Sequence, residues 1–220
     1  MAIKSKIDGN SRISLSDDQL FDQSTANASG LDSTSGNTFV GYLAGQSVDA
    51  GSINNTFIGH GVGDAALADA TQNVGVGAGA LSALTQGDSN VAVGKDALLA
   101  VLAGSTNSVV GRSAGAALTS GSGNTIMGQG AGLTTTDVDN TVIIGKDACV
   151  AVLTGGNGAD GTVAIGKSAL NALTSGAGNV AVGYQASDAI TTGGKNTVVG
   201  YGALTTAGGD ENENTAIGYQ

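Results

Sequence analysis

A glycine preceded by an apolar residue recurs along this chain at nearly constant spacing. The intervals between its eleven occurrences are 18, 18, 17, 17, 17, 17, 21, 17, 17 and 18 residues. The positions are Gly41, Gly59, Gly77, Gly94, Gly111, Gly128, Gly145, Gly166, Gly183, Gly200 and Gly218. Self-similarity at a fixed period is typical of a solenoid in which each repeat forms one coil. The spacing therefore predicts a solenoid of eleven coils of 17–18 residues over residues 37–220.

The composition favours an all-β solenoid built from small side chains. The 220 residues include 38 Gly, no Pro and no Trp, and only 3% are aromatic, so the large rings that fill an ordinary core are scarce. Glu occurs only twice and Lys plus Arg total 8, which leaves few residues for exposed helix surfaces. We therefore expect close stacking of short strands into a parallel β-solenoid.

Two positions before each glycine define the strand of each coil. The residue directly before the glycine, the pre-glycine column, is β-branched in ten of eleven coils, as expected for a strand. The residue four before the glycine is Asn in nine coils and Thr in two, at Thr141 and Thr162. Stacked at about 4.8 Å, these amides can hydrogen bond from coil to coil as a ladder.

The residue two before each glycine, the middle column, is also apolar in most coils. Neighbouring strand residues point to opposite faces, so one of the two apolar columns must face inward and the other outward. We assign the pre-glycine column to the interior and the middle column to an exposed stripe about 48 Å long, ten coil steps of strand spacing. Soluble monomers rarely expose such a stripe, so the sequence predicts a homotrimer closed by rotation. The predicted trimer seam consists of Phe39, Phe57, Val109, Ile126, Ile143 and Val198.

The second half of each coil follows its own pattern. Ala stands three residues after the glycine in nine of ten complete coils, which predicts a site that admits only a small side chain. Seven residues after the glycine most coils carry an apolar residue, which predicts a second wall of the interior. Runs of Gly, Ser, Thr and Asp between these positions predict turns, and the interval of 21 places its insertion in the turn at 155–161.

Residues 1–36 lie outside the repeat. Apolar residues flank Asp8-Gly9-Asn10, which predicts a hairpin, and Ser16-Asp17-Asp18-Gln19 before Leu20 predicts a capped short helix. We interpret residues 1–36 as a segment that docks residues 37–220 onto a virion structural protein. A simple cap over the first coil is an equally weighted alternative.

The charge balance excludes several partners. With 8 basic and 18 acidic residues the formal net charge is −10, whereas a nucleic-acid binder needs a basic face to neutralise phosphates. The first residues lack the apolar stretch of a secretory signal, and the chain contains no run of 18 apolar residues. We therefore expect no nucleic-acid binding and no membrane insertion.

The motifs at several strands resemble those of known repeat families. Asn179-Val180-Ala181-Val182-Gly183 and Thr162-Val163-Ala164-Ile165-Gly166 are similar to the repeats of YadA-like heads in trimeric autotransporter adhesins. Asn214-Thr215-Ala216-Ile217-Gly218-Tyr219 is similar to repeats of phage tail fibres and other virion appendages. The resemblance covers residues 37–220 and implies a homotrimer of left-handed parallel β-rolls.

Two departures from the adhesin pattern favour the viral branch of this resemblance. The repeat is longer than that of adhesin heads, and neither a secretion signal nor a membrane-anchoring barrel is recognised. The expected function is a non-enzymatic structural protein of a phage virion, a trimeric tail fibre or a capsid decoration or head fibre, which attaches to the host surface. It would be made in the host cytoplasm. The alternative is the head of a bacterial cell-surface adhesin, a trimeric autotransporter passenger.

The residue directly after each glycine, the post-glycine column, combines cations and rings. It holds half of the basic residues and all four tyrosines, and such a stripe could bind a host-surface glycan through stacking and cation contacts. Covering or pairing with a neighbouring subunit is the favoured alternative. The candidate surface-binding residues are Tyr42, Lys95, Arg112, Lys146, Lys167, Tyr184 and Tyr201.

No motif predicts catalysis, a cofactor or a metal. Gly161–Ser168 matches the P-loop pattern, but a true P-loop is a loop followed by a helix, whereas Val163–Ile165 is predicted to be a strand. His60 lies in the post-glycine column without a nucleophile at a recognisable spacing, and Cys149 is expected to pack in the interior. Acidic turns such as Asp137-Val138-Asp139 are common without bound calcium.

Overall fold

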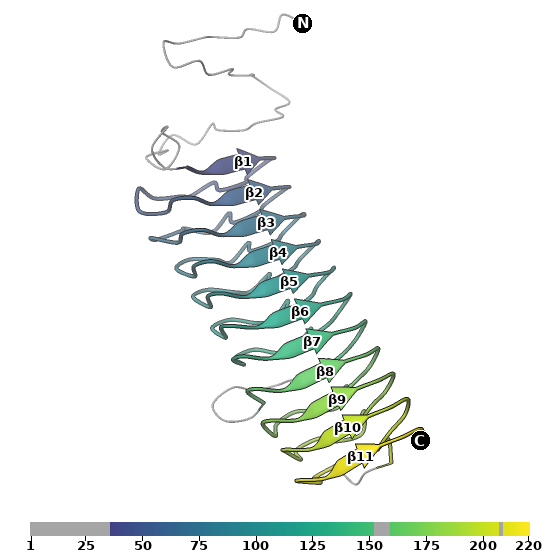
Figure 1. The fold of residues 1–220 in the computed structure, drawn as a ribbon. Helices are drawn as coiled ribbons and strands as arrows, with labels where there is room; N and C mark the ends of the chain where they lie inside the picture. Colours follow the sequence, from purple (N-terminus) through teal and green to yellow (C-terminus); the bar gives the residue numbers. More distant parts are fainter. Residues whose placement is uncertain (1–35, 152–158, 207–208) are drawn as a thin grey trace, which may run out of the picture.

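A computed structural model describes residues 36–151, 159–206 and 209–220 as a parallel β-solenoid (Figure 1). Each coil contributes one strand of three residues, and the strands pair in parallel in chain order to form one eleven-stranded sheet. The strands are β1 Thr38–Val40, β2 Thr56–Ile58, β3 Val74–Val76, β4 Val91–Val93, β5 Ser108–Val110, β6 Thr125–Met127, β7 Val142–Ile144, β8 Val163–Ile165, β9 Val180–Val182, β10 Thr197–Val199 and β11 Thr215–Ile217. Below, each coil is named after its strand.

The all-β solenoid expected from the repeat is confirmed, and the described residues contain no helix. Every strand ends directly before a repeat glycine, and the partners in the ladder are equivalent residues of successive coils, for example Ile126 beside Ile143. The predicted hairpin and helix lie outside the described residues, and of the predicted docking segment 1–36 only Gly36 is described. Most of the predicted insertion at 155–161 lies outside them as well.

The interior is lined by the middle column, opposite to the sequence-based assignment. Phe39, Phe57, Val109, Ile126, Ile143 and Val198, predicted to form a trimer seam, are buried in the chain's own core with at most 1% of their surface exposed. Strand alternation then turns the pre-glycine column outward. The prediction was wrong because both columns are apolar, and the period of two alone does not tell which face is inside.

The second wall of the coil was predicted correctly in its main features. The column of small residues three after the glycine is buried, from Ala44 to Ala203. Most of the described residues seven after the glycine, such as Leu84 and Leu118, are also buried. In coil β2 the chain shifts by one residue, so that Leu67 is buried where Ala66 was expected.

Large and small side chains alternate across this interior. Where the middle column carries Phe57, the residue four after the glycine is Gly63, and a Cβ on Gly63 would lie 2.4 Å from the Phe57 ring. Where the middle column carries Ala92, the facing position is Leu98, and both are fully buried. The same compensation of volume recurs in most coils, so that a large residue on one wall of the core faces a small residue on the other.

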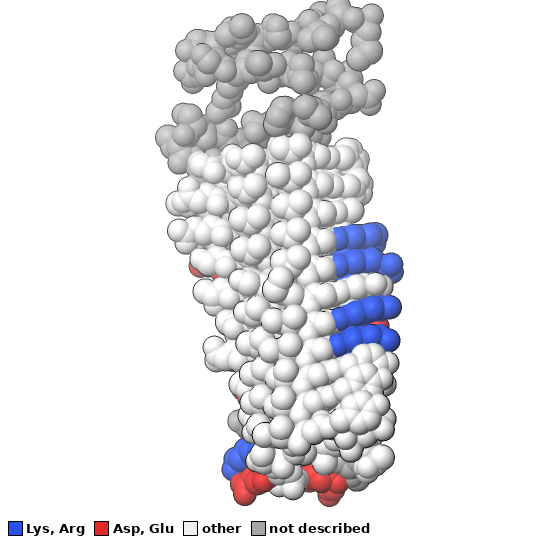
Figure 2. All heavy atoms as spheres, turned by 45° about the vertical axis from the view of Figure 1, so that its right-hand side comes forward, with Lys and Arg blue, Asp and Glu red and all other residues white. Residues whose placement is uncertain are grey.

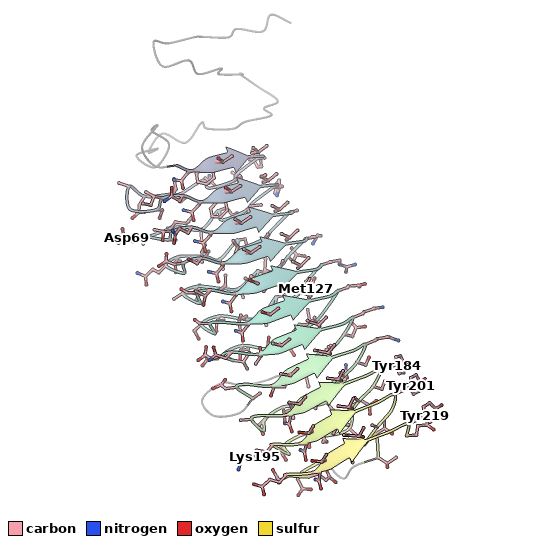
Figure 3. All side chains as sticks on the ribbon, in the orientation of Figure 1. Asp69, Met127, Tyr184, Lys195, Tyr201 and Tyr219 are labelled. Atoms are coloured by element: carbon pink, nitrogen blue, oxygen red, sulfur yellow. The ribbon has the colours of Figure 1, made fainter. Side chains whose placement is uncertain are left out.

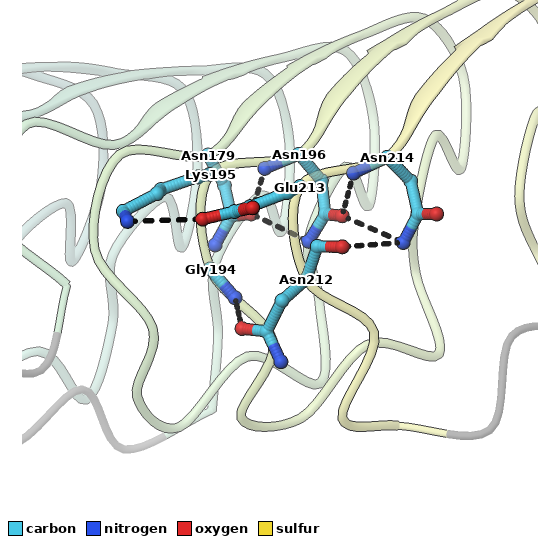
Figure 4. A network of polar contacts seen from close by, with 7 residues as sticks. All are labelled: Asn179, Gly194, Lys195, Asn196, Asn212, Glu213 and Asn214. Atoms are coloured by element: carbon cyan, nitrogen blue, oxygen red, sulfur yellow. Dashed lines mark hydrogen bonds and ion pairs between the residues drawn. The ribbon is translucent and has the colours of Figure 1, made fainter.

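The asparagines form the expected ladder between Asn37 and Asn124 and again from Asn179 to Asn214. Asn196 Nδ2 donates to Asn179 Oδ1 over 3.0 Å, and Asn214 Nδ2 donates to Asn196 Oδ1 over 3.1 Å (Figure 4). Each Oδ1 also accepts the backbone N–H of the next Asn, as in Asn107 to Asn90 at 3.0 Å. Most of these amides are fully buried, so the ladder satisfies polar groups inside the core.

Candidate functional site

The outer face of the sheet is a regular surface that runs along all eleven strands. It consists of the pre-glycine column and of the first residue of each strand, and β3, β4, β7, β8 and β9 present two aliphatic residues each. None of the 22 outer positions is charged, and the polar ones carry only Thr or Ser. Along the pre-glycine column Ile58, Val110 and Met127 remain 39–43% exposed (Figure 3). The outer face is therefore uncharged and rich in β-branched residues.

The post-glycine column follows the edge of the sheet at the carboxyl ends of the strands. Figure 2 shows Lys and Arg stacked along this edge, with one uncharged row between the two pairs. The cations are Lys95, Arg112, Lys146 and Lys167, and Gln129 fills the gap. All five are exposed, so the structure places the predicted surface residues together on one edge.

Aromatic residues continue this column beyond the cations. Tyr184 and Tyr201 stack with ring centroids 4.9 Å apart, and Tyr201 and Tyr219 stack at 5.3 Å (Figure 3). Lys167 Nζ lies 5.4 Å from the centroid of the Tyr184 ring. At the other end of the rod Tyr42 stacks on His60 at 5.4 Å. The rings therefore cover one another's faces along the rod axis, and their edges point to the surroundings.

Two of the cations have acidic neighbours within the chain. Lys95 pairs with Asp96, and Lys146 Nζ lies 3.8 Å from Asp147 Oδ2. The residues after Arg112 and Lys167 are Ser113 and Ser168, and neither cation forms an ion pair within the described residues. The edge therefore keeps excess positive charge in a chain whose net charge is −10.

The other candidate features, the P-loop match and Cys149, have structural explanations. The P-loop match contains β8 at Val163–Ile165, as predicted, and exposed Lys167 follows it without a helix. Cys149 is fully buried, and this burial raises the pKa of its thiol to about 12, so that it packs as an apolar side chain. Among the described residues no group of three His, Cys, Asp or Glu side chains is arranged to hold a metal ion.

Within the described ranges, Asp49 and Asp188 have a pKa that departs from the ordinary value of aspartate. A hydrogen bond from the Ser52 hydroxyl lowers the pKa of Asp49. Desolvation by burial raises the pKa of Asp188. Asp49 caps a turn through the Ser52 N–H at 2.9 Å, which is a structural role.

Comparison of the chain with models of protein families, with curated proteins and with solved structures gives no match. No helix in the described part of the chain has the length and hydropathy needed to cross a bilayer. The outer face and the post-glycine column are therefore the two surfaces from which a function can be argued.

Proposed function

We propose that this chain is a non-enzymatic structural rod that assembles as a homotrimer through its outer face and serves in a virion appendage for attachment to a host surface. The observation that carries the proposal is the uncharged, β-branched outer face that runs along all eleven strands. The resemblance of the strand motifs to adhesin heads and phage fibres supports the same assembly.

A second copy is the partner that best fits the outer face. The face is uncharged and similar in every coil, and it extends for about 48 Å at the spacing of parallel strands. Soluble monomers rarely leave a continuous apolar surface of this size in water. Copies related by rotation about an axis along the rod bury the face over its whole length, and three copies close the arrangement.

The virion setting rests on the resemblance and on the form of the chain. A tail fibre, or a capsid decoration or head fibre, is an elongated body that holds an attachment surface away from the particle, which suits a rod of stacked coils. Residues 1–36 are proposed to dock the rod onto a virion structural protein. The alternative is the head of a bacterial surface adhesin, which has the same architecture.

The trimer is tested by charging the outer face. Met127→Asp places a carboxylate at the centre of the proposed interface, where burial without a partner strongly disfavours association. We expect wild-type protein to sediment as a trimer and the variant as a folded monomer with unchanged circular dichroism. Gln86→Asp, on an exposed turn, is the matched control and should remain trimeric. A wild-type monomer at micromolar concentration would refute the assembly.

Electron microscopy with gold-labelled antibodies against the rod, applied to the particles or cells that carry it, tests whether the protein belongs to a virion or to a bacterial surface. Label on a phage tail or capsid supports the virion proposal. Label on a bacterial surface supports the adhesin alternative.

A further inference from the structure

The two edges of the outer face carry opposite charges on the same coils. Four cations stand in the post-glycine column of coils β4, β5, β7 and β8. The residue six before each glycine lies in the turn that precedes the strand. In this pre-strand column the only acids are Asp88, Asp139 and Asp160, in coils β4, β7 and β8. Each acidic coil therefore also carries a cation, seven residues further along the chain.

Within one chain the cations of the post-glycine column do not pair with the acids of the pre-strand column. The strand separates the two columns, and Figure 3 shows the turns with Asp69 and Lys195 on the side of the sheet opposite to Tyr184 and Tyr219. The ion pairs of the described residues are Lys95–Asp96, Lys146–Asp147 and Lys195–Glu213, so none involves an acid of the pre-strand column. Lys167 and the three acids are therefore available to another molecule, and the exposed Lys95 and Lys146 can exchange their neighbours Asp96 and Asp147 for an acid of another copy.

The acids are held in place by backbone groups of the preceding coil. Asp88 Oδ1 accepts the Thr71 N–H at 2.7 Å, and Asp139 Oδ1 accepts the Ser122 N–H at 2.7 Å. Asp160 Oδ1 accepts the Asp139 N–H at 2.9 Å. One oxygen of each carboxylate is thus fixed, and this orientation leaves the charge on the edge of the sheet.

We propose that these charges form ion pairs between copies: Lys95, Lys146 and Lys167 of each copy bind Asp88, Asp139 and Asp160 of the next. This inference rests on the proposed homotrimer. Rotation about the long axis keeps equivalent coils at one height and brings the carboxyl-end edge of one sheet beside the amino-end edge of its neighbour. The coils that carry both charges then meet pairwise.

The ion pairs would fix the register between copies along the rod, which the apolar face alone leaves undefined. Because the outer face repeats almost identically, neighbouring copies could slip by one coil and still bury nearly the same surface. Without a slip, three of the four cations meet an acid. A slip of one coil leaves two cations beside an acid in one direction and one cation beside an acid in the other. The charges therefore select the unshifted register, which is how electrostatic complementarity gives specificity.

Neutralising either edge of the full chain tests the inference. Lys146→Gln with Lys167→Gln removes two cations, and Asp139→Asn with Asp160→Asn removes their partners while keeping the Oδ1 acceptors. We expect either pair of substitutions to raise the trimer dissociation constant about a hundredfold at low salt, since six weak pairs are lost per trimer. The four substitutions together should raise the dissociation constant no further than either pair alone.

Arg112→Gln is the matched control. The pre-strand residue of its coil is Ser105, so we expect an unchanged dissociation constant. The salt dependence of the wild-type constant should shrink in both neutralised variants, because exposed ion pairs are screened by salt.

The outcomes separate the two proposals. A monomeric wild type would refute the trimer and, with it, the pairing. A trimeric wild type whose constant does not change in either variant would refute the pairing alone. An acidic glycan is the other partner that the cations fit. Loss of retention on immobilised dextran sulfate in the Lys variants, with an unchanged trimer in both variants, would assign the column to such a glycan and overturn the inference.

Discussion

At the scale of the residue, the glycine that ends each strand is required by the spacing of the coils. Gly111 has φ +143°, and a Cβ added there would lie 2.4 Å from the carbonyl oxygen of Gly128 in the next coil. Most other repeat glycines meet the next glycine backbone at similarly short distances. A side chain at these positions would push neighbouring coils apart. The close approach of successive backbones therefore requires glycine, which explains why glycine recurs at the coil period.

Ile126 and Met127 are neighbours in β6 with opposite environments. Ile126 is fully buried, so Ile126→Asp places an unpaired charge inside a core of small side chains and should destabilise the fold by several kcal/mol. We expect this variant to be unfolded or insoluble, in contrast to a folded Met127→Asp monomer. Thermal unfolding followed by circular dichroism distinguishes the two. A stable, folded Ile126→Asp protein would contradict the assignment of the interior.

Coil β9 has no large side chain at either facing position of the core, because Ser187 stands where coil β8 carries Leu170. Ser187 faces the small Ala181, is buried, and its hydroxyl has no hydrogen-bond partner in the described residues. Leu occupies the equivalent position at Leu170 with φ 48°, close to the 51° of Ser187. Ser187→Leu should therefore raise the free energy of unfolding by about 1–2 kcal/mol, measured by urea denaturation. Ser187→Ala serves as a control that removes the hydroxyl without filling the space.

At the scale of the element, the sequence predicts where the strands lie but not which of their two faces is buried. The glycine period and the β-branched pre-glycine column define where each strand ends, which the structure confirms. The facing could not be predicted from one strand because its neighbouring columns are both apolar. The informative signal lay elsewhere: the middle column varies in volume against the residue six positions later, as in Phe57 with Gly63 and Ala92 with Leu98. Such compensation indicates contact across a shared interior.

An exchange of volumes in coil β4 tests this compensation. Ala92→Ile alone should overpack the core and cost about 1–3 kcal/mol, while Leu98→Gly alone should leave a cavity and cost about 2–5 kcal/mol. The double variant reproduces the Ile126 and Gly132 pair of coil β6, so its loss should be smaller than the sum by at least about 1 kcal/mol. Ala92→Ile combined with Leu173→Ala, in a distant coil, should be additive. Additive losses in the first pair would contradict the contact.

The asparagine ladder has a gap where its sequence pattern has Thr. Thr162 Oγ1 is buried without a hydrogen-bond partner, whereas Thr141 Oγ1 donates to Asn124 Oδ1 over 2.7 Å. Thr162→Asn would offer its Oδ1 to the N–H of Asn179, as the other asparagines do. We expect a gain of about 1 kcal/mol in the free energy of unfolding, measured by chemical denaturation. Thr141→Asn, at a satisfied position, should gain less, and equal gains would contradict the explanation.

At the scale of the whole molecule, the candidate surfaces were only partly predictable. The post-glycine column was found from the sequence because cations and rings recur at the coil period. The outer face was not predicted, because the sequence pattern led to the assignment of its pre-glycine column to the interior. The proposed pairing between copies depends on both edges of the sheet, because Asp139 and Lys146 are close in sequence but lie on opposite sides of the strand.

An assembly held by the outer face makes thermal stability depend on protein concentration. Unfolding of a trimer releases three chains, so mass action shifts the midpoint upward as concentration rises. We expect the wild-type melting temperature to increase by a few degrees over a hundredfold range of concentration. The Met127→Asp monomer should melt at one temperature throughout, because its unfolding releases no partner. Calorimetry at three concentrations makes the measurement, and a wild-type midpoint that stays constant would mean that each rod is stable alone and that its outer face is not buried by other copies.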